Sequence, residues 1–294
     1  MTVVGVVGLG TMGRALAELF ASRGCEVRGF DVRQYEVSYE EHTEVGREGV
    51  AITSSIAECV AEVDFAIEAV AEDIDVKRAV LAEISAHTAG VVASNTSTFV
   101  PSVLADAVST PERFLVAHFF NPPHVVPLVE IVPGPRTAPT ATAGIVDLLN
   151  RMGRHPVLLA SECPGFVANR LQAAILREAL ALIEAGIASP STVDQIVVNG
   201  LAPRWAAAGP IGIADLGGLD IWERVSVELF PLLSAASQPS PLLTALVETG
   251  HLGAKSGRGF YEHVAEIDAR TFDTMKRHFE LGAPRSGEAL NATQ

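Results

Sequence analysis

The sequence predicts an α/β fold with a doubly wound, mostly parallel sheet, followed by an all-α C-terminal domain. Two observations predict this fold. Short β-branched runs alternate with helical stretches through the first half of the chain, which is typical of parallel strands joined by crossover helices. Beyond the motif Pro164-Gly165-Phe166 the strand signal fades and long amphipathic stretches follow. A length of 294 residues accommodates two domains, which we expect at residues 1–161 and 162–294.

The individual elements follow from where apolar residues cluster and how they repeat. Runs rich in Val, Ile and Phe between turn residues predict strands at residues 3–7, 26–31, 50–53, 64–69, 91–94, 114–119, 126–132 and 155–159. Helical periodicity predicts helices at residues 12–22, 55–61, 74–86, 101–107 and 139–152. In the second half, the amphipathic stretches are residues 167–184, 219–230 and 242–248. Residues 284–294 lack periodicity, and we expect them to fray.

The composition excludes several classes of protein. The chain carries 35 acidic residues against 21 Lys and Arg, a formal charge of −14, so it is a poor candidate for binding nucleic acid or an anionic membrane. No apolar run approaches the roughly 18 residues that a membrane span needs, and no basic stretch or cleavage site follows Met1. Cys25, Cys59 and Cys163 have no metal-ligand spacing. We therefore expect a cytoplasmic protein with reduced cysteines and without a metal site.

A glycine-rich turn directly follows the first expected strand. It leads into an Ala-rich helix and consists of Gly8, Leu9, Gly10, Thr11, Met12 and Gly13. The three glycines serve a tight turn, a close approach of the backbone to a pyrophosphate and a tight helix–strand contact, and the helix N-terminus receives the anion. Asp31 lies 18 residues beyond Gly13, where a carboxylate accepts hydrogen bonds from ribose hydroxyls and repels a 2′-phosphate. The pattern predicts a Rossmann-type site for NAD, although Arg33 nearby keeps NADP open.

A histidine and a glutamate indicate the chemistry. His118 lies at the end of an expected strand, and Glu130, twelve residues further, is the single carboxylate of an otherwise apolar strand. A buried carboxylate needs a partner, and on one nitrogen of a histidine it leaves the other nitrogen free to take a proton from an alcohol. Considered alone, a histidine such as His118 is more often a structural residue of the core than a general base. Its coincidence with Glu130, with the polar cluster at 94–97 and with a dinucleotide fold favours a general base.

Six motifs, in this order, resemble the L-3-hydroxyacyl-CoA dehydrogenase family. They cover nearly the whole chain and are GLGTMG (8–13), SNTST (94–98), HFFNPP (118–123), PLVEIV (127–132), PGFVANR (164–170) and GAKSGRGFY (253–261). The resemblance implies that His118 is the general acid/base and that Glu130 orients it. The residues that it implies as holding the substrate's oxygens are Ser97, Asn121 and Asn169. The residues that it implies as cofactor contacts are Asp31, Glu72, Lys77, Asn95 and Lys255.

Several features depart from the fatty-acid-degrading members of that family. Those members carry a long helical hairpin after the ribose-binding Asp that contacts coenzyme A, whereas only residues 32–49 separate Asp31 from the next strand here. This segment has five glutamates against two arginines, a formal charge of −3, which repels the phosphates of coenzyme A. Segments 123–127 and 204–206 resemble relatives that oxidise free hydroxy acids, such as gulonate or carnitine dehydrogenases. Arg204 is suited to a substrate carboxylate, or is an interface or helix-end arginine.

The leading hypothesis is an NAD-dependent dehydrogenase that interconverts a 3-hydroxyacyl and a 3-oxoacyl compound, with a thioester such as 3-hydroxyacyl-CoA as the default. Its alternatives are a free 3-hydroxy acid, or a short hydroxyacyl group on an acyl carrier protein in the synthesis of polyketide extender units. A non-catalytic hypothesis, a structural or NAD-sensing relative like the lens crystallin, is disfavoured by the intact His118, Glu130, Ser97 and Asn121. The amphipathic helical half has apolar faces to cover, which predicts a homodimer.

Overall fold

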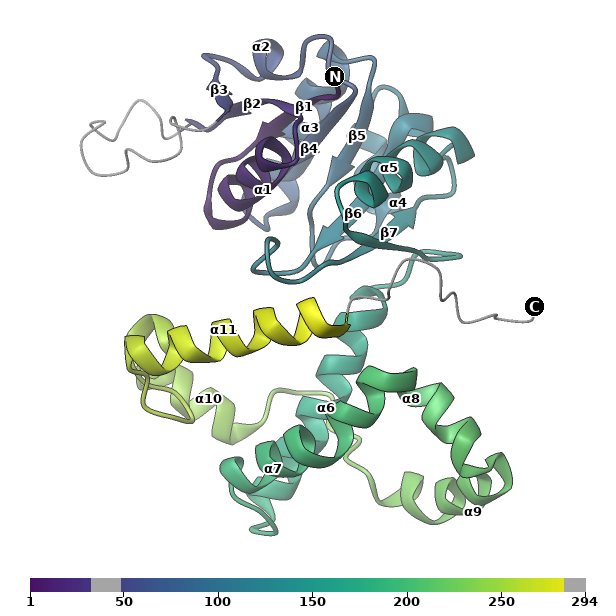
Figure 1. The fold of residues 1–294 in the computed structure, drawn as a ribbon, viewed down its shortest axis with the longest axis vertical. Helices are drawn as coiled ribbons and strands as arrows, with labels where there is room; N and C mark the ends of the chain where they lie inside the picture. Colours follow the sequence, from purple (N-terminus) through teal and green to yellow (C-terminus); the bar gives the residue numbers. More distant parts are fainter. Residues whose placement is uncertain (33–48, 283–294) are drawn as a thin grey trace. The chain divides into compact units, whose positions relative to one another are not determined.

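The computed structural model describes residues 1–32 and 49–282 and divides into two compact units (Figure 1). The first unit is Met1–Asn169 and the second is Arg170–Gln294. The division falls inside helix α6 (Phe166–Glu184), whose first turn is hydrogen-bonded to the first unit. The domain boundary expected between residues 161 and 162 stays a prediction. The acidic segment at 33–48 and the fraying expected at 284–294 lie outside the described residues.

The first unit is built on an eight-stranded sheet, which confirms the predicted doubly wound fold. Its strands are β1 (Val3–Val7), β2 (Glu26–Phe30), β3 (Val50–Ile52), β4 (Phe65–Glu68), β5 (Val91–Ser94), β6 (Phe114–Phe119), β7 (Leu128–Pro133) and β8 (His155–Leu158). Their order is β3-β2-β1-β4-β5-β6-β7-β8, and every neighbouring pair is parallel except β6 and β7. The strand order reverses between β1 and β4, so a ligand crevice is expected at the carboxyl ends of these strands.

Helices cover both faces of this sheet. They are α1 (Thr11–Ser22), α2 (Ile56–Val60), α3 (Ile74–His87), α4 (Pro101–Leu104) and α5 (Pro139–Arg151). Val6 of β1 points into one apolar core, which α1 and α5 complete with Phe20 and Ile145. Val7, the next residue along the strand, points to the opposite face and into a second core, which includes Leu81 of α3. Helices and apolar cores therefore cover both faces of the sheet, so a ligand is expected at the edge formed by the carboxyl ends of the strands.

Most expected elements of the first unit end within one residue of the observed ones, and two differ more. Strand β7 begins at Leu128 rather than at residue 126, because Pro127 has no N–H to donate to the ladder. The helix expected at 101–107 ends as α4 at Leu104 and continues as a 3₁₀ turn, Ala105–Ala107.

The second unit is helical, as predicted. Besides α6, its helices are α7 (Pro190–Ile196), α8 (Ala202–Gly217), α9 (Leu219–Leu229), α10 (Pro241–Glu248) and α11 (Ala265–Gly282). A π-helical turn, Val197–Leu201, joins α7 to α8, and α8 is kinked at Gly209, where φ is +66°. Among the side chains that the structure describes in this unit, Leu180 is the one buried hydrophobic residue. Within residues 1–32 and 49–282, no helix combines the length and the apolar character needed to cross a membrane.

Candidate active site

The glycine-rich turn lies at the carboxyl end of β1, beside β4. Gly8 has a φ of +94°, and its N–H donates to the carbonyl of Phe30 at 2.8 Å. A Cβ on Gly8 would lie 2.8 Å from the backbone of Ala69, and a Cβ on Gly13 would lie 1.7 Å from the Gly8 carbonyl oxygen. Both separations are too short for a side chain, so these two positions require glycine and the turn packs directly against the end of β4.

The residues around this turn fit a dinucleotide. Helix α1 begins at Thr11 after Gly10 without a side-chain cap, so its first N–H groups and its positive dipole end are suited to a pyrophosphate. Met12 packs against the first apolar core. Asp31 is 8% exposed, and its Oδ2 accepts a hydrogen bond from the N–H of Leu9 at 2.7 Å. That bond fixes a carboxylate beside the turn, where a ribose is expected.

His118 and Glu130 face each other across the antiparallel pair β6 and β7. The strand register pairs the two residues directly, which puts their side chains on one face. His118 Nδ1 lies 2.9 Å from Glu130 Oε2, and both residues are 3% exposed. The pair lies at the same edge of the sheet as the glycine turn, since β6 ends at Phe119 and β7 begins at Leu128. Because the carboxylate accepts the Nδ1 proton, Nε2 is the nitrogen with a lone pair.

The second oxygen of Glu130 holds the start of α6. Its Oε1 accepts hydrogen bonds from the N–H groups of Val167 and Ala168, each at 3.0 Å. Phe166, the residue before them, is fully buried with a φ of +49°, and its ring centroid lies 5.4 Å from that of His118. Both oxygens of Glu130 are therefore occupied as hydrogen-bond acceptors, one by the imidazole and one by the backbone of α6.

The residues expected to hold the substrate's oxygens lie on three segments at this edge. Ser97 follows β5, Asn121 follows β6, and Asn169 lies in the first turn of α6. Asn169 Nδ2 donates to the carbonyl oxygen of Ser97 at 3.2 Å, so the structure brings these two residues together. Ser97 and Asn121 are exposed. Asn95 Oδ1 accepts the N–H of Phe119 at 3.0 Å, which ties the loop after β5 to the end of β6.

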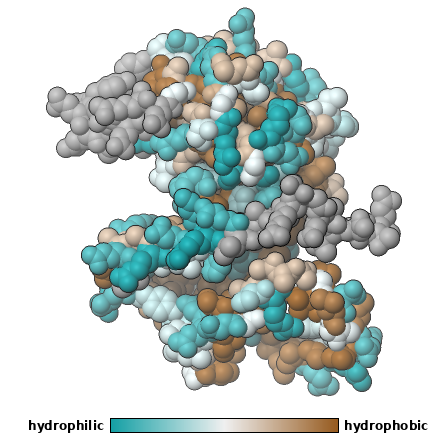
Figure 2. All heavy atoms as spheres, viewed as in Figure 1, coloured by the Kyte–Doolittle hydropathy of each residue, from teal (hydrophilic) through white to brown (hydrophobic). Residues whose placement is uncertain are grey.

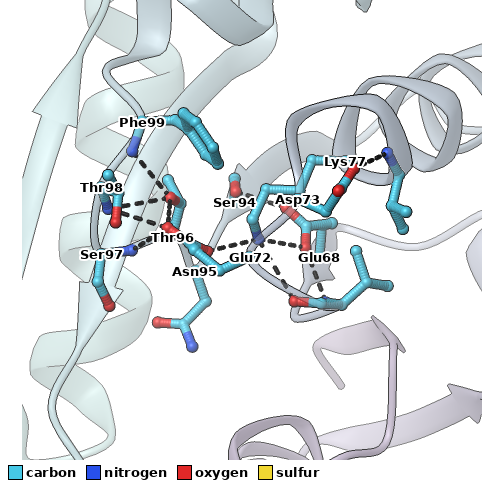
Figure 3. A network of polar contacts seen from close by, with 12 residues as sticks. Glu68, Glu72, Asp73, Lys77, Ser94, Asn95, Thr96, Ser97, Thr98 and Phe99 are labelled. Atoms are coloured by element: carbon cyan, nitrogen blue, oxygen red, sulfur yellow. Dashed lines mark hydrogen bonds and ion pairs between the residues drawn. The ribbon is translucent and has the colours of Figure 1, made fainter. Parts of the chain in front are cut away.

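A network of polar contacts joins the ends of β4 and β5 to α3 (Figure 3). Its outer member is Glu72, whose Oε1 accepts hydrogen bonds from Thr96 Oγ1 at 2.5 Å, from the N–H of Ser97 at 3.1 Å and from the N–H of Thr98 at 3.0 Å. Lys77 Nζ lies 3.2 Å from Glu72 Oε2. Burial by itself raises the pKa of Glu72, but the hydrogen bond from Thr96 and the charge of Lys77 outweigh it, so this pKa lies below its usual value.

The sequence reasoning does not single out the inner member of this network, Glu68. It is fully buried at the end of β4, and its Oε1 lies 2.9 Å from the Nζ of Lys77, which is fully buried as well. Ser94 Oγ donates to Glu68 Oε2 at 2.5 Å. A signal is present, because a carboxylate ends an apolar strand and a lysine follows nine residues later. A buried carboxylate needs a partner, and this requirement holds for Glu68 as it does for Glu130.

Two expected residues belong to the second unit. Lys255 lies in a 3₁₀ turn, Ala254–Ser256, and Arg204 lies in the first turn of α8, and both are exposed. Their contacts with cofactor and substrate stay predictions. In the part of the chain that the structure describes, no three or more His, Cys, Asp or Glu side chains are grouped so as to hold a metal ion.

A glycine turn that fits NAD and an imidazole–carboxylate pair at the same edge of the sheet define an NAD-dependent dehydrogenase. The model of the 3-hydroxyacyl-CoA dehydrogenase NAD-binding domain matches residues 3–163, and that of the family's C-terminal domain matches residues 165–263. The chain belongs to the 3-hydroxyacyl-CoA dehydrogenase family. It is an NAD-dependent oxidoreductase that acts on CH–OH groups, as the resemblance implied.

The chain is similar to several named relatives. It is 34% identical over 281 residues to a 5-formyl-3-hydroxy-2-methylpyridine 4-carboxylate 5-dehydrogenase of Mesorhizobium japonicum, covering 90% of this chain and 91% of the relative. It is 33% identical to an L-carnitine dehydrogenase of Streptomyces griseus, covering 97% and 92%. It is 36% identical to a 3-hydroxybutyryl-CoA dehydrogenase of Mycobacterium tuberculosis, covering 88% and 98%.

A similar solved structure is that of a 5-formyl-3-hydroxy-2-methylpyridine 4-carboxylic acid 5-dehydrogenase, described as an NAD⁺-dependent dismutase. It matches the chain with a TM-score of 0.87 at 31% sequence identity. The match covers 97% of this chain and 100% of that one, so both units have counterparts in it.

Proposed function

We propose that the chain interconverts a 3-hydroxyacyl and a 3-oxoacyl compound, with His118 and Glu130 as its acid/base pair and a thioester such as 3-hydroxyacyl-CoA as the default substrate. The observation that carries the proposal is the 2.9 Å contact between His118 Nδ1 and Glu130 Oε2 at the edge of the sheet that holds the glycine turn. It supports an imidazole whose Nε2 accepts the proton of an alcohol, which is worth roughly 10²- to 10⁴-fold in rate.

In the oxidation direction, His118 Nε2 takes the hydroxyl proton, and the carboxylate of Glu130 stabilises the positive charge that the imidazole gains. NAD, when bound, supplies the acceptor for the hydride that leaves C3. The substrate's oxygens are held by hydrogen bonds from Ser97, Asn121 and Asn169. These bonds change in strength as the charge on the oxygens changes during the reaction. In the reverse direction, the same imidazole returns the proton to the forming alcohol.

The cofactor is held by two sets of residues in this proposal. The glycine turn and the uncapped start of α1 take the pyrophosphate, and Asp31 takes the adenine ribose. Glu72 and Asn95, at the neighbouring strand ends, contact the remainder of NAD. Lys77 is 0% exposed and acts on the cofactor through Glu72. Lys255 adds a contact from the second unit.

Replacing Asp31 by Ala tests the ribose assignment. We expect NADH to bind roughly tenfold more weakly, because a charged hydrogen-bond acceptor is lost. NADPH affinity is expected to change little, since the loss of a hydrogen-bond acceptor is offset by the loss of the carboxylate that repels the 2′-phosphate. Fluorescence titrations with the two cofactors measure both effects. Asp31→Asn is the matched control, because it keeps an acceptor for the Leu9 N–H and removes only the charge. Unchanged NADH binding in Asp31→Ala would exclude this residue from the ribose site.

A second candidate substrate is a free acid that carries the hydroxyl group. Its support is that two of the similar relatives are named for small molecules, a pyridine 4-carboxylate and L-carnitine, rather than for an acyl-CoA. The TM-score of 0.87 to the pyridine-carboxylate enzyme adds to this support. Arg204 is the candidate partner for the substrate carboxylate. The formal charge of −3 on the acidic segment, which lies outside the described residues, also disfavours coenzyme A.

A comparison of kcat/KM values separates the candidate substrates. The chain is assayed with NAD, by NADH absorbance, on 3-hydroxybutyryl-CoA, on free 3-hydroxy acids including L-carnitine and gulonate, and on a hydroxyacyl group attached to an acyl carrier protein. The highest value with the CoA thioester is the expected result. A highest value with a free acid would favour the second candidate, and one with the carrier protein would make that protein the partner. No turnover of any of them would refute the proposed reaction.

We propose that the second unit forms a homodimer. Hydrophobic side chains gather around α8 and α9 in Figure 2, and those that are at least 68% exposed there include Ile211, Leu216, Val227, Phe230 and Leu232. An apolar surface of this extent, on a unit that buries little of its own, is typical of an interface between identical copies.

Light scattering is expected to report about twice the chain mass of 30.9 kDa. Val227→Glu places a charge in the proposed interface and is expected to reduce the mass to that of one chain. Glu228→Gln, at an exposed residue on another face of the same helix, is the control and should keep the dimer. A monomeric wild-type chain at working concentration would refute the homodimer.

We propose a cytoplasmic location on the basis of the cysteines. Cys25, Cys59 and Cys163 are free thiols, and burial raises the pKa of Cys59 to about 11, so that thiol is protonated and unreactive. Free thiols fit a reducing compartment. Disulfide-linked protein, isolated from cells under thiol-blocking conditions, would contradict this location.

A further inference from the structure

Glu68 and Lys77 form a buried ion pair that has no direct part in the proposed chemistry. Both side chains are 0% exposed, and Lys77 Nζ lies 2.9 Å from Glu68 Oε1. Taking two charges out of water is costly, and apolar residues of similar volume often stabilise a fold as well or better. Stability of the fold is therefore a weak explanation for this pair, and its position at the edge of the sheet suggests a functional one.

Glu68 connects three segments at the point where the strand order reverses. Its Oε1 also accepts the N–H of Val70 at 2.8 Å, and its Oε2 accepts Ser94 Oγ at 2.5 Å. Its backbone carbonyl accepts the N–H of Asn95 at 2.8 Å. The residue after it, Ala69, packs against the glycine turn. Glu68 thus fixes the end of β4 between the turn that fits the pyrophosphate and the loop that follows β5.

Lys77 connects Glu68 to Glu72. Its Nζ lies between the two carboxylates, 2.9 Å from Glu68 Oε1 and 3.2 Å from Glu72 Oε2, and it donates to the carbonyl of Val70 at 3.5 Å (Figure 3). These three partners match the three donors of an ammonium group. With one oxygen of Glu72 held by Lys77, the other oxygen accepts the backbone N–H groups of Ser97 and Thr98.

We propose that Glu68 is a positioning residue for cofactor binding and hydride transfer: through Lys77 it holds Glu72, and through Glu72 it holds the segment that carries Ser97. The inference rests on the proposed function, in which Glu72 contacts NAD and Ser97 contacts the substrate. It also accounts for a lysine that has no exposed surface, because the charge of Lys77 acts on the site by fixing and polarising Glu72 rather than by touching the cofactor.

Three variants separate this role from a structural one: Glu68→Gln, Lys77→Met and the double variant. Glu68→Gln removes one of the two carboxylates that face the buried Lys77, and Lys77→Met leaves the buried Glu68 without its cation. Tm, NADH affinity and kcat are therefore all expected to fall, the affinity and kcat by roughly tenfold or more. The double variant removes both fully buried charges and leaves only the partly exposed Glu72 without its cation, so Tm is expected to recover. It is expected to keep the weak NADH binding and the low kcat, because Glu72 has lost its cation. Asp106→Asn, in an exposed ion pair with Arg136, is the control and should change none of these values.

Recovery of NADH affinity and kcat together with Tm in the double variant would overturn the proposal and leave the pair a structural role. Wild-type values in Glu68→Gln would overturn it as well. If Glu68→Gln does not fold, Ser94→Ala removes one hydrogen bond from Glu68 and keeps both charges, and a loss of NADH affinity of a few fold is expected. An unchanged affinity in Ser94→Ala would then contradict the proposal. NADH binding needs no substrate, so failure of the proposed reaction would show separately, as a wild-type chain that binds NADH and turns over nothing.

Discussion

His118→Gln is expected to lower kcat by roughly 10²- to 10⁴-fold while NADH affinity stays near its wild-type value. A glutamine amide has a shape that fits the buried position, but it cannot take a proton from an alcohol at neutral pH. The glycine turn and Asp31 directly follow β1 and β2, and strands β4 and β5 separate β1 from β6, so their contacts with the cofactor are expected to survive the change. Steady-state assays and fluorescence titration with NADH measure the two quantities separately.

His87→Gln is the matched control, because it makes the same exchange at an exposed histidine at the end of α3. It should leave both kcat and NADH affinity unchanged. If His118→Gln weakens NADH binding as much as it lowers kcat, the histidine supports the structure of the site rather than the proton transfer.

Glu130→Gln is expected to lower kcat by a similar factor, roughly 10²- to 10⁴-fold, and to lower Tm by several degrees. Glu130 is an acceptor at both oxygens, toward the imidazole of His118 and toward the N–H groups of Val167 and Ala168. A glutamine has one acceptor and one donor, so its NH₂ group must face one of these partners. Facing α6, it opposes two N–H donors. Facing the imidazole, it selects the tautomer with the proton on Nε2, which removes the base.

Thermal unfolding and kcat, measured on the same samples, test both halves of this expectation. Glu83→Gln, at an exposed glutamate of α3, is the control and should alter neither quantity. A lower Tm with an unchanged kcat would limit Glu130 to holding the start of α6 and would remove it from the acid/base pair.

The fold of the first unit was largely predictable because its signals are local. The strand Val3–Val7, the glycines at 8, 10 and 13 and the helix after them all lie within the first 22 residues. The pairing of His118 with Glu130 was predictable by a different route. A lone carboxylate in an apolar strand requires a partner, whichever residue supplies it, and the two strands are close in sequence.

The remaining features depend on contacts that no local pattern reveals. The N–H of Val167 reaches Glu130 across 37 residues, so the sequence cannot show that the first unit includes the start of α6. Glu68 carries a signal, because it is a lone carboxylate at the end of an apolar strand, but its pairing with Lys77 is not predictable since a lysine on a helix is usually a surface residue. In the second unit, Gly209 has a non-helical backbone and interrupts α8 at a kink, with Pro210 directly after it. The helical stretches on either side of this kink are short, and no helix was predicted for them.

The backbone of Phe166 has a consequence for how far this protein can be stabilised. At a φ of +49° a residue with a Cβ is strained, by about 1 kcal/mol or more, and glycine would relieve that strain. The Phe166 ring is fully buried, and its centroid lies 5.4 Å from that of the His118 imidazole. Loss of a buried phenylalanine side chain costs about 3–5 kcal/mol, which exceeds the strain, so both the stability of the fold and the packing around the imidazole favour Phe166 over glycine.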